Sequence, residues 1–400
     1  MASRQRLGAL LLSFALVLPL PAAAVEEHDD EFDEVTAEEL QLEDIPVDER
    51  IFLKRWNAVP FGTEHFRYSD QQMQQRWDQL TRALQIPYPS ADYIRTHFER
   101  YPMLREGIEN FDGDYEALHK RYLGIGRSFL AGEFQRTREE GMKLGLPGIG
   151  FAMLSQIIYA IYLSDSQSEK HMLLQDVMSN TRQYLKDIEE LEQDADVAPY
   201  AILIRHCYTY AMARIAEEVP IPVAVARNYI PRIKSNADHI MELMPDQPMA
   251  HALRAGVDAG IIRRVGKFTG RITYRARNTV IDSSFQRAEE QLPDMALVLY
   301  EKANALVYVN RHREAQQALE LFDRAASIPP LFAMEALDAM YAYKRRNEVL
   351  LYLNEFRSFR QFDKARRKFA RATDTNLTSV LAPPLTRDML MDPKAWLASR

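Results

Sequence analysis

The segment ALELFDRAASIPP, residues 318–330, decides the fold class, because its pattern recurs earlier in the chain. The segment IDSSFQRAEEQLP, residues 281–293, lies 37 residues before it and has the same order of marks. Each has a small or apolar residue, then Phe, Ala and Pro after gaps of three, two and four residues. A weaker copy, IKSNADHIMELMP, occupies residues 233–245. Small residues let paired helices approach, Phe fills the space to the next pair, and Pro ends the helix. This recurrence predicts stacked helical hairpins.

Two of these regions resemble tetratricopeptide repeats (TPRs). ALELFDRAASIPP and HIMELMPDQPMAHALRAG, residues 239–256, look like the end of one helix, a proline stop and the start of the next helix. FLAGEFQRTREEGMKLG, residues 129–145, looks like a degenerate unit. The resemblance covers about residues 113–345, and Leu306 departs from it where a small residue is usual. It implies an all-α, TPR-like α-solenoid of about five helix pairs, near residues 115–145, 149–193, 197–244, 248–292 and 294–328.

Within that class, the chain is similar to exported bacterial repeat proteins. The segments that carry this resemblance are the apolar IYAIYL helix (158–163) and the AMEALD segment (333–338). It distantly resembles the helical T-component of TRAP transporters, whose members are thought to hold apolar ligands in the periplasm.

Outside the repeats, a further helix is predicted to start after Ser69 and Asp70, which are good capping residues. Its apolar stripe contains Met73, Trp77, Leu80 and Leu84.

The two ends of the chain predict its compartment and its boundaries. Residues 1–24 have a short basic start, an apolar run and a small-residue end, which are typical of a cleaved signal peptide. Cys207 is the single cysteine, so no intramolecular disulfide can form, and we expect a periplasmic protein that could also associate peripherally with a membrane. The predicted divisions are a signal peptide (1–24), an acidic disordered leader (25–47), an N-terminal helical cap (48–112), the solenoid (113–330), a long C-terminal capping helix (331–373) and a flexible tail (374–400).

Charge is distributed unevenly along the chain. Residues 26–44 hold eleven acids and no Lys or Arg, although the whole chain has a net charge of only -7. Such a run buries too little apolar surface to fold alone. In contrast, IIRRVGKFTGRITYRARNTVID, residues 261–282, contains six cations, and no acid lies between Asp258 and Asp282. These candidate anion- or partner-binding residues are Arg263, Arg264, Lys267, Arg271, Arg275 and Arg277.

We expect this basic segment to be an insertion of about 17 residues, Arg263 to Thr279, that replaces the short turn between two paired helices. Three interpretations remain open: a structural loop clasped by the acidic leader, a site for anionic lipid, and a site for an acidic protein partner. Nucleic acid is disfavoured as a ligand, because the chain is acidic overall and carries an export signal.

A second candidate surface is apolar. The segments FAMLSQIIYAIYL (151–163) and PYAILIRHCYTYAMA (199–213) are apolar nearly all round, which favours burial. They form either the plain solenoid core or the wall of a cavity for an apolar ligand. In a cavity, tyrosines would orient the ligand. The candidate groove residues are Tyr159, Tyr162, Tyr200 and Tyr208.

The sequence contains no motif for catalysis, for a metal or for a cofactor. His206 is adjacent to Cys207, but neighbours in a helix point about 100° apart, so we expect a packed Cys and a partly exposed His. The sequence therefore favours a non-catalytic periplasmic scaffold or adaptor that binds a protein partner. The alternative is a periplasmic carrier for a lipid or another apolar ligand in a transport system, which would differ from a scaffold in having a closed apolar cavity.

Overall fold

The computed structural model describes residues 48–399, and these residues form helices and no strand. The all-α prediction is confirmed, whereas the predicted signal peptide and acidic leader lie outside the described residues. In chain order, the α-helices are α2 (Arg50–Leu53), α3 (Asp70–Leu80), α4 (Ala91–Arg100), α5 (Tyr115–Leu130), α6 (Phe134–Met142), α7 (Leu146–Tyr162), α8 (Gln167–Arg182), α9 (Ile188–Leu191), α10 (Ala198–Ala216), α11 (Ile221–Ala226), α12 (Tyr229–Leu243), α13 (Pro248–Tyr274), α14 (Asn278–Gln291), α15 (Ala296–Asn310), α16 (Ala315–Ser327), α17 (Ala333–Glu355), α18 (Phe359–Thr373), α19 (Arg387–Met391) and α20 (Pro393–Ala398).

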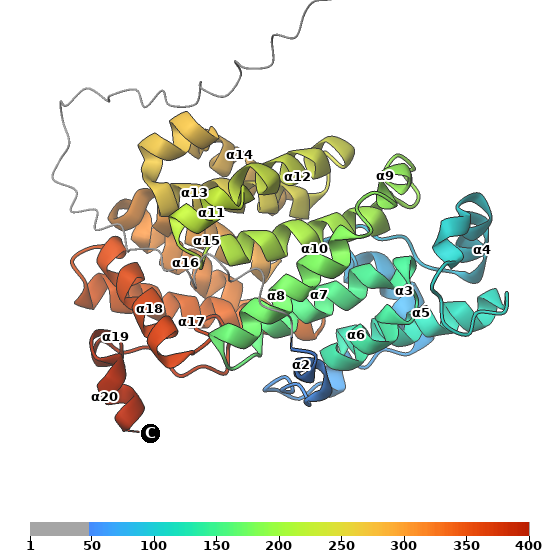
Figure 1. Ribbon diagram of the computed structural model, residues 1–400, viewed down its shortest axis with the longest axis horizontal. Helices are drawn as coiled ribbons and strands as arrows, with labels where there is room; N and C mark the ends of the chain where they lie inside the picture. Colours follow the sequence, from blue (N-terminus) through green and yellow to red (C-terminus); the bar gives the residue numbers. More distant parts are fainter. Residues whose placement is uncertain (1–47, 400) are drawn as a thin grey trace, which may run out of the picture.

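Long helices that follow one another in the chain pack side by side. From α5 to α8 and from α12 to α17, each helix contacts the next, and α10 contacts both α8 and α12. Contacts between α7 and α10, α13 and α15, and α15 and α17 join every second helix (Figure 1). The Phe and Ala residues of the repeated sequence pattern are buried in these helices: Phe285 and Ala288 in α14, and Phe322 and Ala325 in α16. Both helices end before the prolines that the pattern contains.

The start of the described chain packs against the start of α17. Tyr68 donates a hydrogen bond to the carbonyl of Leu331 at 2.6 Å, and Arg82 forms an ion pair with Glu335 at 2.5 Å. Ser69 caps α3, as predicted, and Gln72 completes a capping box. Met73, Trp77 and Leu80 are buried below it, whereas Leu84 of the predicted stripe lies beyond the end of the helix. Segments more than 200 residues apart therefore meet and cover the interior between α3, α7 and α10.

The predicted insertion is helical instead. Helix α13 runs through the basic segment to Tyr274, and only residues 275–277 separate it from α14. Gly266 interrupts the helix with φ 81° and ψ 164°, a conformation that is essentially restricted to glycine. After this kink, Gly270 lies against Ile261 and Ile262. The residues that follow Gly266 therefore turn back on the helix and do not form an extended loop.

The predicted capping helix at 331–373 is two helices. Helix α17 ends at Glu355, and α18 starts at Phe359 after Ser358, whose extended backbone and side chain cap α18. Phe356 at the break and Phe359 and Phe362 on α18 are all buried.

The predicted flexible tail does not fit the structure between residues 374 and 399. Asn376 is buried and donates hydrogen bonds to the carbonyls of Ala160 and Ser164, both at 3.0 Å. The amide of Val380 donates to the carbonyl of Tyr162 at 2.9 Å. These carbonyls lie at and just beyond the C-terminal end of α7, where they have no partner within the helix. The tail is therefore held in place by the hydrogen bonds that it donates to the carbonyls at the end of α7.

Candidate functional site: an apolar cavity between α10 and α13

A cavity of about 220 Å³ lies between the long helices α10 and α13. One water molecule needs only about 10–15 Å³ of such space. The hollow exists because α13 presents Ala252, Gly256 and Gly260, four residues apart and so on one face, to this space. A Cβ atom placed on Gly256 would meet no side chain and no other helix within 4 Å.

Apolar side chains from several helices form the wall. Helix α3, helix α7 and the start of α17 contribute the largest groups, and the contact between α17 and the N-terminal region closes this side. The lining residues on these three elements are Met73, Trp77, Leu80, Phe151, Leu154, Ile157, Ile158, Ile161, Tyr162, Phe332 and Met334.

The cavity is elongated along its two main helices. Its lining residues run from Leu203 to Glu217 on α10 and from Met249 to Val265 on α13. At a rise of about 1.5 Å per residue, these stretches are roughly 21 Å and 24 Å long. This shape fits an extended molecule better than a compact one.

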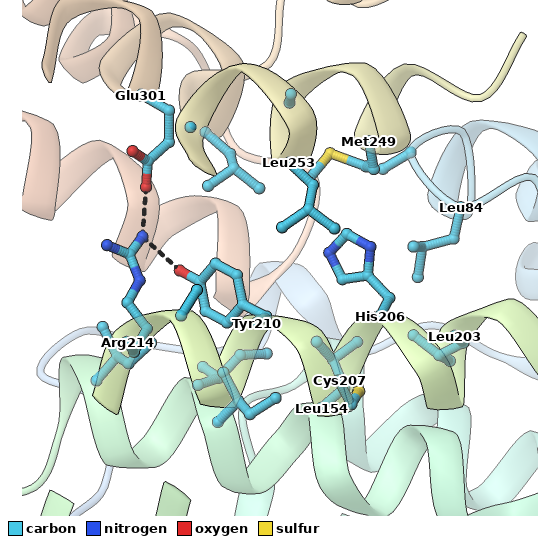
Figure 2. Close-up of a pocket in the computed structure, with 18 of the residues that line it drawn as sticks. Leu84, Leu154, Leu203, His206, Cys207, Tyr210, Arg214, Met249, Leu253 and Glu301 are labelled. Atoms are coloured by element: carbon cyan, nitrogen blue, oxygen red, sulfur yellow. Dashed lines mark hydrogen bonds and ion pairs between the residues drawn. The ribbon is translucent and has the colours of Figure 1, made fainter. Parts of the chain in front are cut away.

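A polar cluster lies toward one end of this cavity (Figure 2). Arg214 donates to the Tyr210 hydroxyl at 2.8 Å and to Glu301 Oε1 at 2.6 Å, and it pairs with Glu217 at 3.2 Å. The two carboxylates stabilise the Arg214 cation against its burial, so its pKa lies well above the usual range. The two terminal nitrogens of Arg214 are paired within the cluster, whereas its Nε has no partner.

His206 extends into the cavity about two helical turns away from Arg214 on α10 (Figure 2). Its ring lies near Leu84, Met249 and Leu253. The side chain is 8% exposed, and burial lowers the pKa of the imidazole to about 4. The prediction of a partly exposed His206 is therefore wrong, because the ring points inward from α10.

Cys207 also lines the cavity, and it is fully buried. Burial raises the pKa of its thiol far above the usual range, so the sulfur is protonated at neutral pH. Its Sγ lies 3.7 Å from the carbonyl oxygen of Gly150. As predicted, this cysteine is a packed side chain.

Of the predicted groove tyrosines, Tyr162 alone lines this cavity, and its hydroxyl is bonded to Asp338 at 2.7 Å. Tyr159 stacks on Trp56, with ring centroids 4.2 Å apart. Tyr200 donates to the carbonyl of Pro87 at 2.7 Å and lines a separate, smaller pocket of about 30 Å³. The Tyr208 hydroxyl accepts a hydrogen bond from Arg232. The structure therefore does not bring the four tyrosines together.

The six predicted cations separate into two groups. Arg263 forms a buried ion pair with Asp363 at 2.7 Å, and Arg264 donates to the carbonyl of Val219 at 2.5 Å while lining the cavity. Burial, together with nearby Arg367 and Arg263, lowers the pKa of Arg264 to about 10. The other four, Lys267, Arg271, Arg275 and Arg277, are exposed beyond Gly266.

Sequence reasoning missed Tyr210, Arg214 and Glu301 as cavity residues. Nothing local marks Glu301, because it reaches Arg214 from α15 across 87 positions of sequence. The spacing of Ala252, Gly256 and Gly260 puts three small residues on one helical face, but the sequence alone does not distinguish a face that leaves space from one that packs closely.

Within residues 48–399, no group of three or more His, Cys, Asp or Glu side chains could hold a metal ion. None of the described helices is both long enough and apolar enough to span a membrane. No protein family model, curated protein or solved structure matches the chain.

Proposed function

We propose that this protein is a non-catalytic carrier that holds one extended apolar molecule in the cavity between α10 and α13. The observation that carries this proposal is the cavity itself, which is lined mostly by apolar side chains and has room for many water-sized volumes. Water gains little in such a space, whereas an apolar ligand removes its own surface from water. The periplasmic setting expected from residues 1–24 belongs to the same proposal.

The arrangement that we propose for the helices is a TPR-like α-solenoid of about five pairs, bent so that its inner face surrounds the ligand. The serial contacts from α5 to α8 and from α12 to α17 support it. So does the buried Phe–Ala pattern of α14 and α16. The N-terminal region and the start of α17 would then close the hollow face.

Filling the cavity tests the proposal. Gly256→Leu places a side chain in the open space on the α13 side of the cavity, so it should reduce binding of the neutral fluorescent probe N-phenyl-1-naphthylamine at least tenfold. The helix itself should tolerate this change, because Leu is a better helix former than Gly by roughly 0.5–1 kcal/mol. Fluorescence titration measures the affinity, and circular dichroism verifies the fold.

Gly124→Leu is the matched control. Gly124 is also within a helix, α5, and does not line the cavity. This variant should bind the probe as the wild type does. Equal binding by the wild type and Gly256→Leu would show that the probe does not occupy this space, and it would contradict the proposal.

A protein-binding or membrane-binding scaffold is the second candidate, and one surface favours it. Beyond Gly266, Phe268 and Ile272 are 75% and 64% exposed, and they lie one turn apart on α13. Lys267 and Arg271 immediately precede them and are exposed too. Apolar side chains beside cations are typical of surfaces that bind anionic membranes or acidic partners. This surface can coexist with a carrier function, because it lies outside the cavity.

A further inference from the structure

His206 differs from the other buried histidines of residues 48–399. His97 Nδ1 is 2.8 Å from the carbonyl of Tyr93, and His251 Nε2 is 2.7 Å from the carbonyl of Pro245. His206 is buried to the same degree, yet its Nδ1 has no hydrogen-bond partner among the described residues. Native proteins nearly always satisfy such an atom. Because His206 also lines the cavity, its ring is placed to bind a molecule held there.

The immediate surroundings of His206 are apolar. Leu84, Met249 and Leu253 surround the ring (Figure 2), and the Tyr210 ring lies parallel to it with centroids 6.3 Å apart. The Tyr210 hydroxyl is already the acceptor for Arg214. None of these side chains forms a hydrogen bond with His206 Nδ1, so a molecule in the cavity is the available partner for the ring.

The charges that line the cavity decide which ligand class fits. Arg214 and Arg264 contribute two cations, while Glu217 and Glu301 contribute two anions, so their formal sum is zero. Arg214 is paired with both carboxylates. A charged ligand head next to His206 would lie among apolar groups with no counterion beside it, which is unfavourable.

A neutral imidazole has one N–H donor and one acceptor nitrogen. The complementary group is a hydroxyl, which both donates and accepts, or a carbonyl, which accepts from the N–H. We infer that His206 is the polar anchor of the cavity and binds the hydroxyl or carbonyl oxygen of an uncharged, extended apolar molecule. This inference rests on the proposed carrier function and adds the ligand class and the residue that selects it.

The test compares three probes with the same carbon chain: dodecan-1-ol, 1-chlorododecane and dodecanoate. Each displaces N-phenyl-1-naphthylamine from the protein, and competition titrations give their affinities. The wild type should bind dodecan-1-ol about five- to tenfold more tightly than 1-chlorododecane, which is the size of effect expected for one hydrogen bond. Dodecanoate should bind less tightly than the alcohol.

Two variants assign the preference to His206. His206→Phe keeps the ring and removes both nitrogens, so it should bind the fluorescent probe normally and lose the preference for the alcohol. His206→Gln keeps a donor and an acceptor, and it should retain part of that preference. Circular dichroism of both variants establishes their folding, and the Gln variant with the wild type keeps the test decisive if the Phe variant does not fold.

The outcomes separate the two proposals. If the fluorescent probe binds and His206→Phe keeps the alcohol preference, the anchor is not His206, although the carrier function stands. If the wild type has no preference among the neutral probes, a water molecule is the partner of His206 and the inference is overturned. Tighter binding of dodecanoate would overturn the uncharged ligand class. If the fluorescent probe itself fails to bind, the carrier proposal fails.

Discussion

Asp338 and His206 are both buried titratable residues, yet their surroundings differ in one decisive respect. Asp338 on α17 accepts a hydrogen bond from Tyr162, whose hydroxyl lies 2.6 Å from that of Tyr300. His206 on α10 faces an apolar cavity, and its Nδ1 has no partner. Burial keeps both groups uncharged at neutral pH: it raises the pKa of Asp338 to about 8 and lowers that of His206 to about 4.

The comparison distinguishes a buried polar group that stabilises the fold from one that lines a candidate binding site. Asp338 does not line the cavity: Tyr162 of α7 donates to its Oδ1, and Tyr300 of α15 bonds to Tyr162, although its Oδ2 has no partner. This chain of hydrogen bonds joins α7, α15 and α17. Around His206, small residues of α13 leave space and supply nothing polar. A shifted pKa occurs in both places, so the shift does not identify a site. An unpaired buried atom also occurs in both places, at Asp338 Oδ2 and at His206 Nδ1. What distinguishes His206 is that it lines the cavity.

The largest expected difference between the two residues is in stability. Asp338→Leu should lower the free energy of unfolding by about 2–3 kcal/mol, because a buried tyrosine hydroxyl loses its acceptor. His206→Phe should change it by less than about 1 kcal/mol, since no hydrogen bond is lost. Urea unfolding followed by circular dichroism measures both. Asp338→Asn, which keeps an acceptor for Tyr162, should lose less than Asp338→Leu, and equal losses at positions 206 and 338 would remove the distinction.

The pH dependence of stability should differ in sign. Asp338 stays protonated in the folded protein up to a pKa of about 8 but ionises near pH 3.8 when unfolded. Between pH 3.8 and about 8, the folded protein therefore holds one more proton than the unfolded chain, so the free energy of unfolding falls as pH rises. His206 has the opposite effect: between about pH 4 and 6.5 the unfolded chain binds the extra proton, and stability rises with pH.

The window from pH 6.5 to 8 isolates Asp338. There, the wild type should lose stability relative to Asp338→Asn by up to about 1.4 kcal/mol per pH unit. Below pH 6.5, the free energy of unfolding should rise less steeply with pH for His206→Phe than for the wild type. Unfolding curves at a series of pH values provide the measurement. Parallel profiles for the wild type and Asp338→Asn would mean that Asp338 is ionised in the folded protein.

The smallest effect on stability is expected on the exposed part of α13. Replacing both Lys267 and Arg271 by Ala should change the free energy of unfolding by less than about 0.5 kcal/mol. The same change should weaken binding to vesicles that contain phosphatidylglycerol about tenfold or more at low salt, since each cation near an anionic surface contributes about 1 kcal/mol. Vesicle co-sedimentation measures this binding.

Two controls accompany this experiment. Lys186→Ala removes an exposed cation from a different part of the molecule and should leave vesicle binding nearly unchanged. Deleting residues 26–44, which hold eleven acids, should raise binding at low salt and have less effect at high salt. If the double variant binds vesicles as the wild type does, the exposed part of α13 is not the membrane-binding surface.

How far the sequence predicts this molecule depends on how local each cause is. The Phe and Ala residues of the repeated pattern in α14 and α16, and Ser69 as the N-cap of α3, act within one or two turns. The structure has them as predicted. Helix α13 continues where a loop was predicted, and within it Arg263 pairs with Asp363, 100 residues away. Likewise, Asn376 holds the tail through carbonyls near residue 160. The separation in sequence, more than the chemistry, made these contacts unpredictable.

The cavity lies between these extremes. The glycines on one face of α13 were visible, but small residues permit close packing as readily as they leave a hollow. Whether this face packs closely or leaves a hollow depends on where α10 lies opposite Gly256. That position follows from the packing of α7, α10 and α12.

The most direct test of the central claim is to identify what the purified protein carries. The wild type and Gly256→Leu would be purified in parallel without detergent, extracted with chloroform and methanol, and analysed by mass spectrometry. The account predicts that an uncharged apolar molecule with a hydroxyl or carbonyl group accompanies the wild type in near-stoichiometric amount and is strongly depleted in the variant. A wild type that carries no apolar molecule, or equal amounts in both proteins, would contradict it.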